Sequence, residues 1–253
     1  MTSQSLSVKT VFSMMGQQTR GQGMQIRFGL VISVMAAVLS GCVSAPQRSI
    51  ALSTQTLDAR AGKVGVAMTT LPKVDTHLPG ASCLLCIAAA SMANSKLTTY
   101  SHSLPEEGLP KLKSDLVELL RKRGVDAIVI NEDINVAKLP DAKVKGDDVA
   151  KKDFSSFRNK YNIEHLIVID INEVGFERPY SAYVPSGEPK GVVAGLGYEV
   201  SLSNNTYEWY LPLNIQISAD GQWDEPPNYP GLTNAYFQAL ETSKDNLLKP
   251  FSG

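Results

Sequence analysis

The sequence is poor in the residue types that build catalytic and metal centres. Its 253 residues include only three cysteines, three histidines and two tryptophans. His77, His102 and His165 show no ligand spacing, and a closed zinc site takes four protein ligands. Neither Gly-x-Ser-x-Gly nor His-Glu-x-x-His occurs, the motifs of a hydrolase nucleophile and of a metalloprotease. We therefore expect no catalytic residues, no metal, no cofactor and no enzymatic activity.

The sequence also lacks an excess of basic residues. All 25 acidic residues follow Cys42, together with 21 of the 24 basic ones, so the chain from Cys42 onward has a net charge of −4. A nucleic-acid-binding domain should carry a basic field, and we exclude that class. The glycines from Gly191 to Gly197 do not form a dinucleotide loop, because the third spaced glycine is missing and no helix follows. We interpret them as strand glycines at a bulge or a close packing contact.

Residues 24–42 contain the features of a secretory signal in the order in which such signals have them. Arg27 supplies a positive charge, residues 28–38 are almost entirely apolar, and small residues lead into Cys42. The apolar run is shorter than the roughly 20 residues that cross a membrane, which argues against a spanning helix. The ending Leu39-Ser40-Gly41-Cys42 resembles the lipobox of bacterial lipoproteins more closely than the Ala-x-Ala end of a plain cleaved signal.

The lipobox resemblance implies where the protein is located and how it is attached to a membrane. In such lipoproteins the cysteine is diacylglycerated, the signal is cut before it, and the new amino terminus is acylated. Three acyl chains on Cys42 would hold the protein in a membrane permanently, because each buried methylene contributes about 0.8 kcal/mol. Asp after the cysteine retains such proteins in the inner membrane. In this chain the residue after the cysteine is Val43, which implies that the protein is located on the periplasmic face of the outer membrane.

The signal divides the chain into three parts. Residues 1–41 are expected to be the signal peptide, with Met24 as the true start because residues 1–23 do not fit a signal. Residues 42–62 would be the lipidated cysteine and a flexible tether with an end-to-end distance of roughly 25 Å. Residues 63–253 would form one periplasmic domain of ordinary size.

Hydrophobic periodicity predicts alternating strands and helices in this domain. We expect strands over residues 63–71, 125–130, 166–171, 191–203 and 207–218, and helices over residues 82–97, 109–123, after 153 and over 232–247. Between the last two strands, Asn204-Asn205 suits a hairpin turn. Alternation along the last strand places Tyr207, Trp209 and Leu211 on one side, and Pro212 favours an edge position or a bulge. The face of the final helix that is expected to pack against the sheet comprises Leu232, Tyr236, Ala239, Leu240, Ser243 and Leu247. Residues 175–190 are rich in Pro and Tyr and are expected to form an exposed loop.

The segment 109–123 is the clearest helix. Leu112, Leu116, Leu119 and Leu120 recur at three- and four-residue spacing, which gives one apolar face, and Gly124 suits the helix end. We expect this face to pack on the central strand 166–171, whose continuous apolar run is typical of a strand buried on both sides.

The element order predicts an α/β fold: a mixed sheet with parallel core strands, an antiparallel hairpin and helices on both faces. This order resembles the TolB amino-terminal domain and the related lipoproteins LpoB and CsgG. The resemblance covers residues 63–250 and implies a non-enzymatic envelope role, such as docking a partner or assembling a complex. It rests on element order, so no family site residues are carried over.

Two cysteines remain after Cys42, and their Cys-x-x-Cys spacing allows a disulfide, a redox pair or buried thiols. Cys83 and Cys86 enclose Leu84-Leu85 and precede Ile87 and three alanines. This apolar setting suggests that they face the core. We therefore expect a structural disulfide or buried thiols rather than redox catalysis.

Aromatic residues in segments expected to be loops are the remaining functional signal, because aromatics are enriched at interfaces. The candidate partner surface comprises Phe176, Tyr180, Tyr183, Trp223 and Tyr229. The leading hypothesis is a lipid-anchored accessory protein that binds an envelope protein, and it could also self-associate. The alternative is a binding module for lipid or peptidoglycan fragments.

Overall fold

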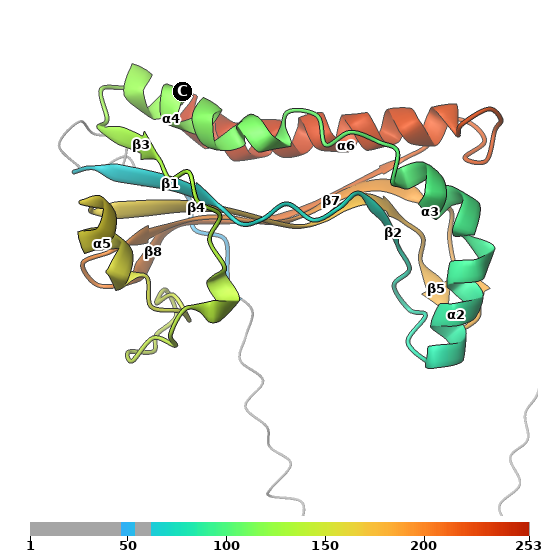
Figure 1. The fold of residues 1–253 in the computed structure, drawn as a ribbon, viewed down its shortest axis with the longest axis horizontal. Coiled ribbons are helices and arrows are strands. Elements are labelled where there is room, and N and C mark those ends of the chain that lie inside the picture. Colours follow the sequence, from blue (N-terminus) through green and yellow to red (C-terminus); the bar gives the residue numbers. More distant parts are fainter. Residues whose placement is uncertain (1–46, 54–61, 253) are drawn as a thin grey trace, which may run out of the picture. The chain divides into compact units, whose positions relative to one another are not determined.

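The computed structural model describes residues 47–53 and 62–252, so Cys42 and the predicted signal lie outside the described residues. The described residues form a mixed sheet of parallel and antiparallel strands with helices on both faces (Figure 1). The predicted α/β fold class is therefore confirmed.

The strands and helices have the following bounds. The strands are β1 (Val64–Met68), β2 (Asp75–His77), β3 (Ala127–Val129), β4 (His165–Glu177), β5 (Tyr180–Ser181), β6 (Val184–Pro185), β7 (Lys190–Ser201) and β8 (Thr206–Ser218). The α-helices are α2 (Leu84–Ala93), α3 (Ser95–Ser101), α4 (Leu112–Lys122), α5 (Ser155–Tyr161) and α6 (Pro230–Leu248). Three short 3₁₀ helices are η1 (Leu109–Lys111), η2 (Val136–Lys138) and η3 (Lys249–Phe251).

The main sheet has the order β3-β1-β4-β7-β8, and β2 pairs with the far end of β4. β1 is parallel to β3 and β4, β2 is parallel to β4, and β4, β7 and β8 are antiparallel to their neighbours. β4 is the centre of the sheet because β1 and β2 share one of its edges and β7 covers the other. Its residues from Leu166 to Ile169 are at most 1% exposed, as predicted for a strand buried on both faces.

The upper face of the sheet in Figure 1 is covered by α4 and α6. Leu112, Leu116 and Leu120 of α4 are buried in this core together with Ile167 and Ile169 of β4, as predicted. Leu119 is only half-buried at the edge of the same cluster, so it belongs less to the apolar face than we expected. The predicted apolar face of α6 is fully buried: Leu232, Tyr236, Ala239, Leu240, Ser243 and Leu247.

The opposite face of the sheet has a second core, built around α5. Phe154 and Phe157 pack there with Tyr198 of β7 and with Tyr207 and Tyr210 of β8. Burial raises the pKa of Tyr207 to about 12 and raises the pKa of Tyr198 further. These hydroxyls therefore stay neutral at neutral pH, and the cluster is a structural core rather than an acid–base site.

Two predictions about β4 and β8 are corrected by the structure. β4 continues to Glu177 and β7 begins at Lys190, so the ends of the expected loop 175–190 are strand, and its middle contains the short hairpin of β5 and β6. A bulge in the β7–β8 pairing places Glu208 between the paired residues Tyr207 and Trp209. The bulge turns Tyr207 to the face opposite Trp209, whereas strict alternation had placed both on one face.

Part of the segment predicted to be a tether, residues 47–53, lies against the domain. Ile50 forms two backbone hydrogen bonds with Tyr210, of 2.9 and 3.0 Å, on the outer edge of β8. Leu52 packs against the upper core. The edge position that Pro212 predicted for β8 is confirmed, and Ile50 covers part of that edge.

The Asn204-Asn205 turn supports a testable prediction about stability. Asn205 has a left-handed backbone with φ of 60°, its Oδ1 accepts from the Phe154 amide at 3.0 Å, and its Nδ2 donates to the carbonyls of Ala150 and Lys152. Asn205→Ala removes all three bonds and places alanine in a disfavoured conformation. We expect a loss of about 2 kcal/mol in unfolding free energy, measured by urea denaturation.

The matched control is Asn204→Ala. Asn204 is exposed, and its Oδ1 accepts hydrogen bonds from the amide and the hydroxyl of Thr206. This variant should lose clearly less stability than Asn205→Ala. Equal losses would show that the three Asn205 hydrogen bonds do not stabilise the turn.

Candidate interaction site: an apolar tip closed by a disulfide

The most unusual surface of the domain lies on α2. This helix contains no charged residue, and Leu84, Leu85 and Met92 are 87%, 72% and 78% exposed. Tyr183 and Val184, in the β5–β6 hairpin, are 55% and 65% exposed. We call α2 together with this hairpin the apolar tip. It extends below the sheet in Figure 1, on the side opposite α4 and α6.

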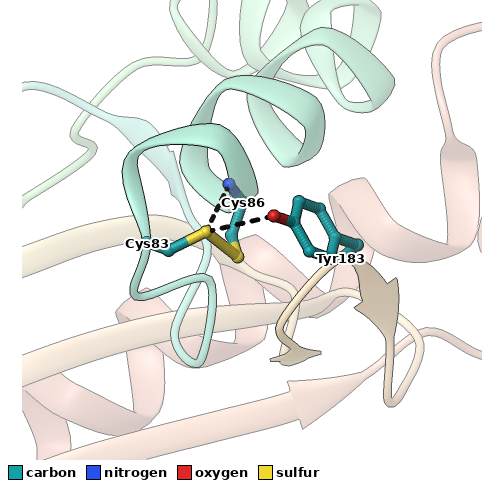
Figure 2. The surroundings of a disulfide bond; sticks show 3 residues. All are labelled: Cys83, Cys86 and Tyr183. Carbon is teal, nitrogen blue, oxygen red and sulfur yellow. Dashed lines mark hydrogen bonds between the residues drawn. A yellow bond between two sulfur atoms is a disulfide. The ribbon is translucent and has the colours of Figure 1, made fainter.

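A disulfide closes the start of α2. Cys83 and Cys86 are bonded, and the Cys83 sulfur also accepts a hydrogen bond from the Cys86 amide at 3.0 Å. The Tyr183 hydroxyl approaches the same sulfur at 3.6 Å from the hairpin, so the disulfide connects the two halves of the tip (Figure 2). The Cys83 sulfur takes the place of the polar N-cap side chain that helices commonly have, and the first turn of α2 contains no charged residue.

The base of the tip is held by a buried polar contact. Asn94, at the end of α2, is 2% exposed and donates to the Tyr180 hydroxyl at 2.7 Å. Its Oδ1 accepts from Arg178 at 2.9 Å, and the Arg178 guanidinium lies 4.7 Å from the centre of the Trp223 ring. These contacts fix the helix by its inner side, where only Cys86 and Ala90 of α2 are buried.

The predicted aromatic partner surface is wrong for two of its five residues, which are buried. Phe176 is fully buried and Tyr180 is 6% exposed, because both lie in strands instead of a loop. Trp223 and Tyr229 are half-buried and stack on each other at 6.3 Å. Tyr183 alone of the five is well exposed.

Sequence reasoning missed α2 as a surface because it expected the Cys-x-x-Cys segment to face the core. A helix that is apolar on all sides is usually buried. Here only one narrow side is covered, and Cys83 itself is exposed. The lack of a charged or polar face in Leu84–Ala93 was the feature of the sequence that could have indicated this surface, but a buried helix has the same feature. The expected single helix over 82–97 is also two helices, with α3 beginning at Ser95.

Removing the disulfide should loosen the tip without removing a chemical activity. Cross-linking a loop of this length contributes up to about 2 kcal/mol in the chain-entropy account. We expect the Cys83→Ala/Cys86→Ala double variant to unfold at lower urea concentration than the wild type, and reduced wild type to behave like the variant. A thiol–disulfide reductase activity of the purified protein, lost in the double variant, would contradict the structural role.

A second cluster of functional groups lies at the other end of β4, where no metal site was expected. Nδ1 of His165 is 3.3 Å from Glu199 Oε1 and 2.8 Å from Glu208 Oε2, and one donor atom from each residue could contact a shared metal ion. The β8 bulge is what brings Glu208 to this position, so spacing in the sequence could not reveal the cluster. A protonated His165 between two carboxylates explains the same distances, and we assign no ion here.

Among residues 47–53 and 62–252, no helix is long and apolar enough to cross a membrane. The apolar tip carries most of the exposed large hydrophobic side chains of the described residues.

Comparison with known proteins gives only distant similarities. No protein-family model matches the chain, and no curated protein matches its sequence. Among solved structures, the PelC dodecamer from Paraburkholderia phytofirmans is 11% identical, with a TM-score of 0.36 and coverage of 81% of this chain and 96% of that one. Lipoprotein GNA1162 from Neisseria meningitidis is 11% identical, with a TM-score of 0.26 and coverage of 72% and 99%. At these scores the similarities carry no argument about the function of this chain.

Proposed function

We propose that this chain is a lipoprotein anchored through Cys42 to the periplasmic face of the outer membrane. The observation that carries the proposal is the lipobox-like Leu39-Ser40-Gly41-Cys42 after an apolar signal segment. Disulfides are typical of proteins outside the reducing cytosol, and the Cys83–Cys86 bond agrees with an envelope location. Val43 after the cysteine supports the outer rather than the inner membrane.

The role we propose is that of a non-enzymatic accessory factor that binds a protein partner or helps to assemble an envelope complex. A cluster of exposed apolar side chains marks an interaction site for a protein or a membrane, and the apolar tip is such a cluster. The TolB amino-terminal-like element order supports the same role by analogy only. The alternative, a module that binds lipid or peptidoglycan fragments, is favoured by one specific observation, the uncharged exposed face of α2.

Cross-linking in whole cells, followed by purification of the tagged chain under denaturing conditions, distinguishes these two proposed roles. An accessory factor should give a reproducible adduct with one envelope protein, at wild-type expression levels. The matched control is the Cys42→Ala variant, in which loss of the lipid anchor should weaken that adduct. Recovery of peptidoglycan fragments, or of cross-linked lipid beyond the acyl chains on Cys42, with no protein adduct would favour the alternative and contradict the accessory role.

A further inference from the structure

The exposed large apolar residues of the described chain are concentrated in one place. Of seven such residues, six lie in the apolar tip and the seventh is Val144. The outward side of α2 offers aliphatic groups and alanines, without a charge to pair. Protein interfaces of ordinary composition contain about one hydrogen bond per 100–200 Å², together with arginine and aromatic anchors. The surface of α2 suits a partner that makes no directional contacts, such as the acyl region of a lipid bilayer.

Gln47, the described residue nearest to Cys42 in the sequence, indicates which side of the domain faces the membrane. The amide of Gln47 lies 3.4 Å from Asp148, in the connection between η2 and α5. This part of the chain and the apolar tip both lie below the sheet in Figure 1, away from α4 and α6. Five residue steps separate Cys42 from Gln47, which allows at most about 18 Å of extended chain. A lipid on Cys42 therefore keeps Gln47 close to the bilayer, and with it the side from which the tip extends.

The connection between η2 and α5 offers a second contact of matching chemistry. Val144 is 68% exposed and stands between the exposed residues Lys143 and Lys145. An apolar side chain flanked by lysines suits the boundary between acyl chains and headgroups. The same connection also contains the exposed residues Asp141, Asp147 and Asp148, so it has no net positive charge and its contribution is the apolar side chain with its two neighbouring lysines. The tip and this connection belong to different parts of the chain, and both lie below the sheet in Figure 1.

We infer that the apolar tip is a membrane-contacting element that inserts Leu84, Leu85 and Met92 into the lipid surface beside the Cys42 anchor. This inference rests on the proposed lipidation, which selects the side that faces the bilayer. The disulfide and the Tyr183 contact hold α2 folded as it meets the lipid, and Lys143 and Lys145 meet the headgroups. Two separate contacts besides the anchor would fix the orientation of the domain on the membrane.

The test uses the full lipidated protein in vesicles of phosphatidylethanolamine and phosphatidylglycerol, with and without brominated acyl chains. Leu85→Trp places a fluorophore at the tip, at a position that is 72% exposed and can accept a larger side chain. Glu118→Trp places one on the exposed side of α4, away from the tip, as the matched control. An interfacial element lies about 5–10 Å below the headgroup boundary, so bromine should quench most of the emission added by Leu85→Trp. The emission added by Glu118→Trp should be unchanged.

Each outcome separates this inference from the proposed anchor. Protein that fails to float with the vesicles would contradict the lipid anchor. Protein that floats while Leu85→Trp escapes quenching by brominated lipid would contradict membrane contact at the tip. If that tryptophan is also shielded from acrylamide, a protein surface or a second copy of the chain covers the tip instead. Val184→Trp, at a hairpin position that is 65% exposed, repeats the measurement while leaving α2 and the Tyr183 contact unchanged.

Discussion

Leu116→Ala should lower the free energy of unfolding by about 2–5 kcal/mol, the range for truncating a buried leucine. Leu116 is 1% exposed and belongs to the core that α4 forms with β1, β4 and α6. A cavity at this point removes contacts to the centre of the sheet. Because a typical domain has only about 5–15 kcal/mol of stability, the variant should also be degraded faster in cells. Urea denaturation of the purified protein measures the loss.

Glu118→Ala is the matched control on the same helix. Glu118 is exposed and forms an ion pair with Lys122 at 2.7 Å, with both side chains about two-thirds exposed. Exposed pairs of this kind contribute little to stability, so the control should unfold close to the wild type. Equal midpoints for Leu116→Ala and Glu118→Ala would contradict the orientation of α4 described above.

Cys42→Ala should abolish lipid attachment completely. Only an amino-terminal cysteine accepts the acyl chains in the proposed processing, and without them the described domain has only its surface contacts to hold it on a membrane. We expect no incorporation of labelled palmitate. The chain should be either unprocessed or, if another peptidase cleaves it, released into the soluble fraction.

Cys83→Ala is the control for this experiment, because it removes a cysteine from the same protein without touching the lipobox. It should still incorporate palmitate and remain with the outer membrane. Palmitate on the Cys42→Ala variant would refute the anchor, and so would its loss from the Cys83→Ala variant alone.

Much of the fold follows from local patterns in the sequence. The leucine spacing of α4, the apolar run of β4 and the face of α6 all predict the burial that is observed. The extension of β4 to Glu177 was missed because Gly175 interrupts the pattern. That glycine has φ of 135°, and a Cβ there would lie 2.0 Å from the Asp75 carbonyl oxygen of β2. A glycine is needed at this position because the backbone lies against a strand that is distant in the sequence, and a local sequence pattern cannot show such a contact.

The interaction site was predicted only in part, for a similar reason. Tyr183 and the cysteines could be named from the sequence, but the exposure of α2 depends on which elements are left to cover it. The helices α4 and α6 cover the upper face of the sheet, and α5 lies on the other. Residues 84–93 are thus left at one end of the domain with only Cys86 and Ala90 buried. Apolar composition cannot distinguish a core helix from one that meets a partner or a lipid.

The most direct measurement of the central claim is the mass of the amino-terminal tryptic peptide of the protein extracted from outer membranes. Cleavage after Arg48 should give a peptide that begins at Cys42 and ends at Arg48. The account predicts that this peptide carries a diacylglyceryl group on the sulfur and an acyl chain on the amino group. An unmodified Cys42, or a peptide that continues to residues before it, would contradict the account.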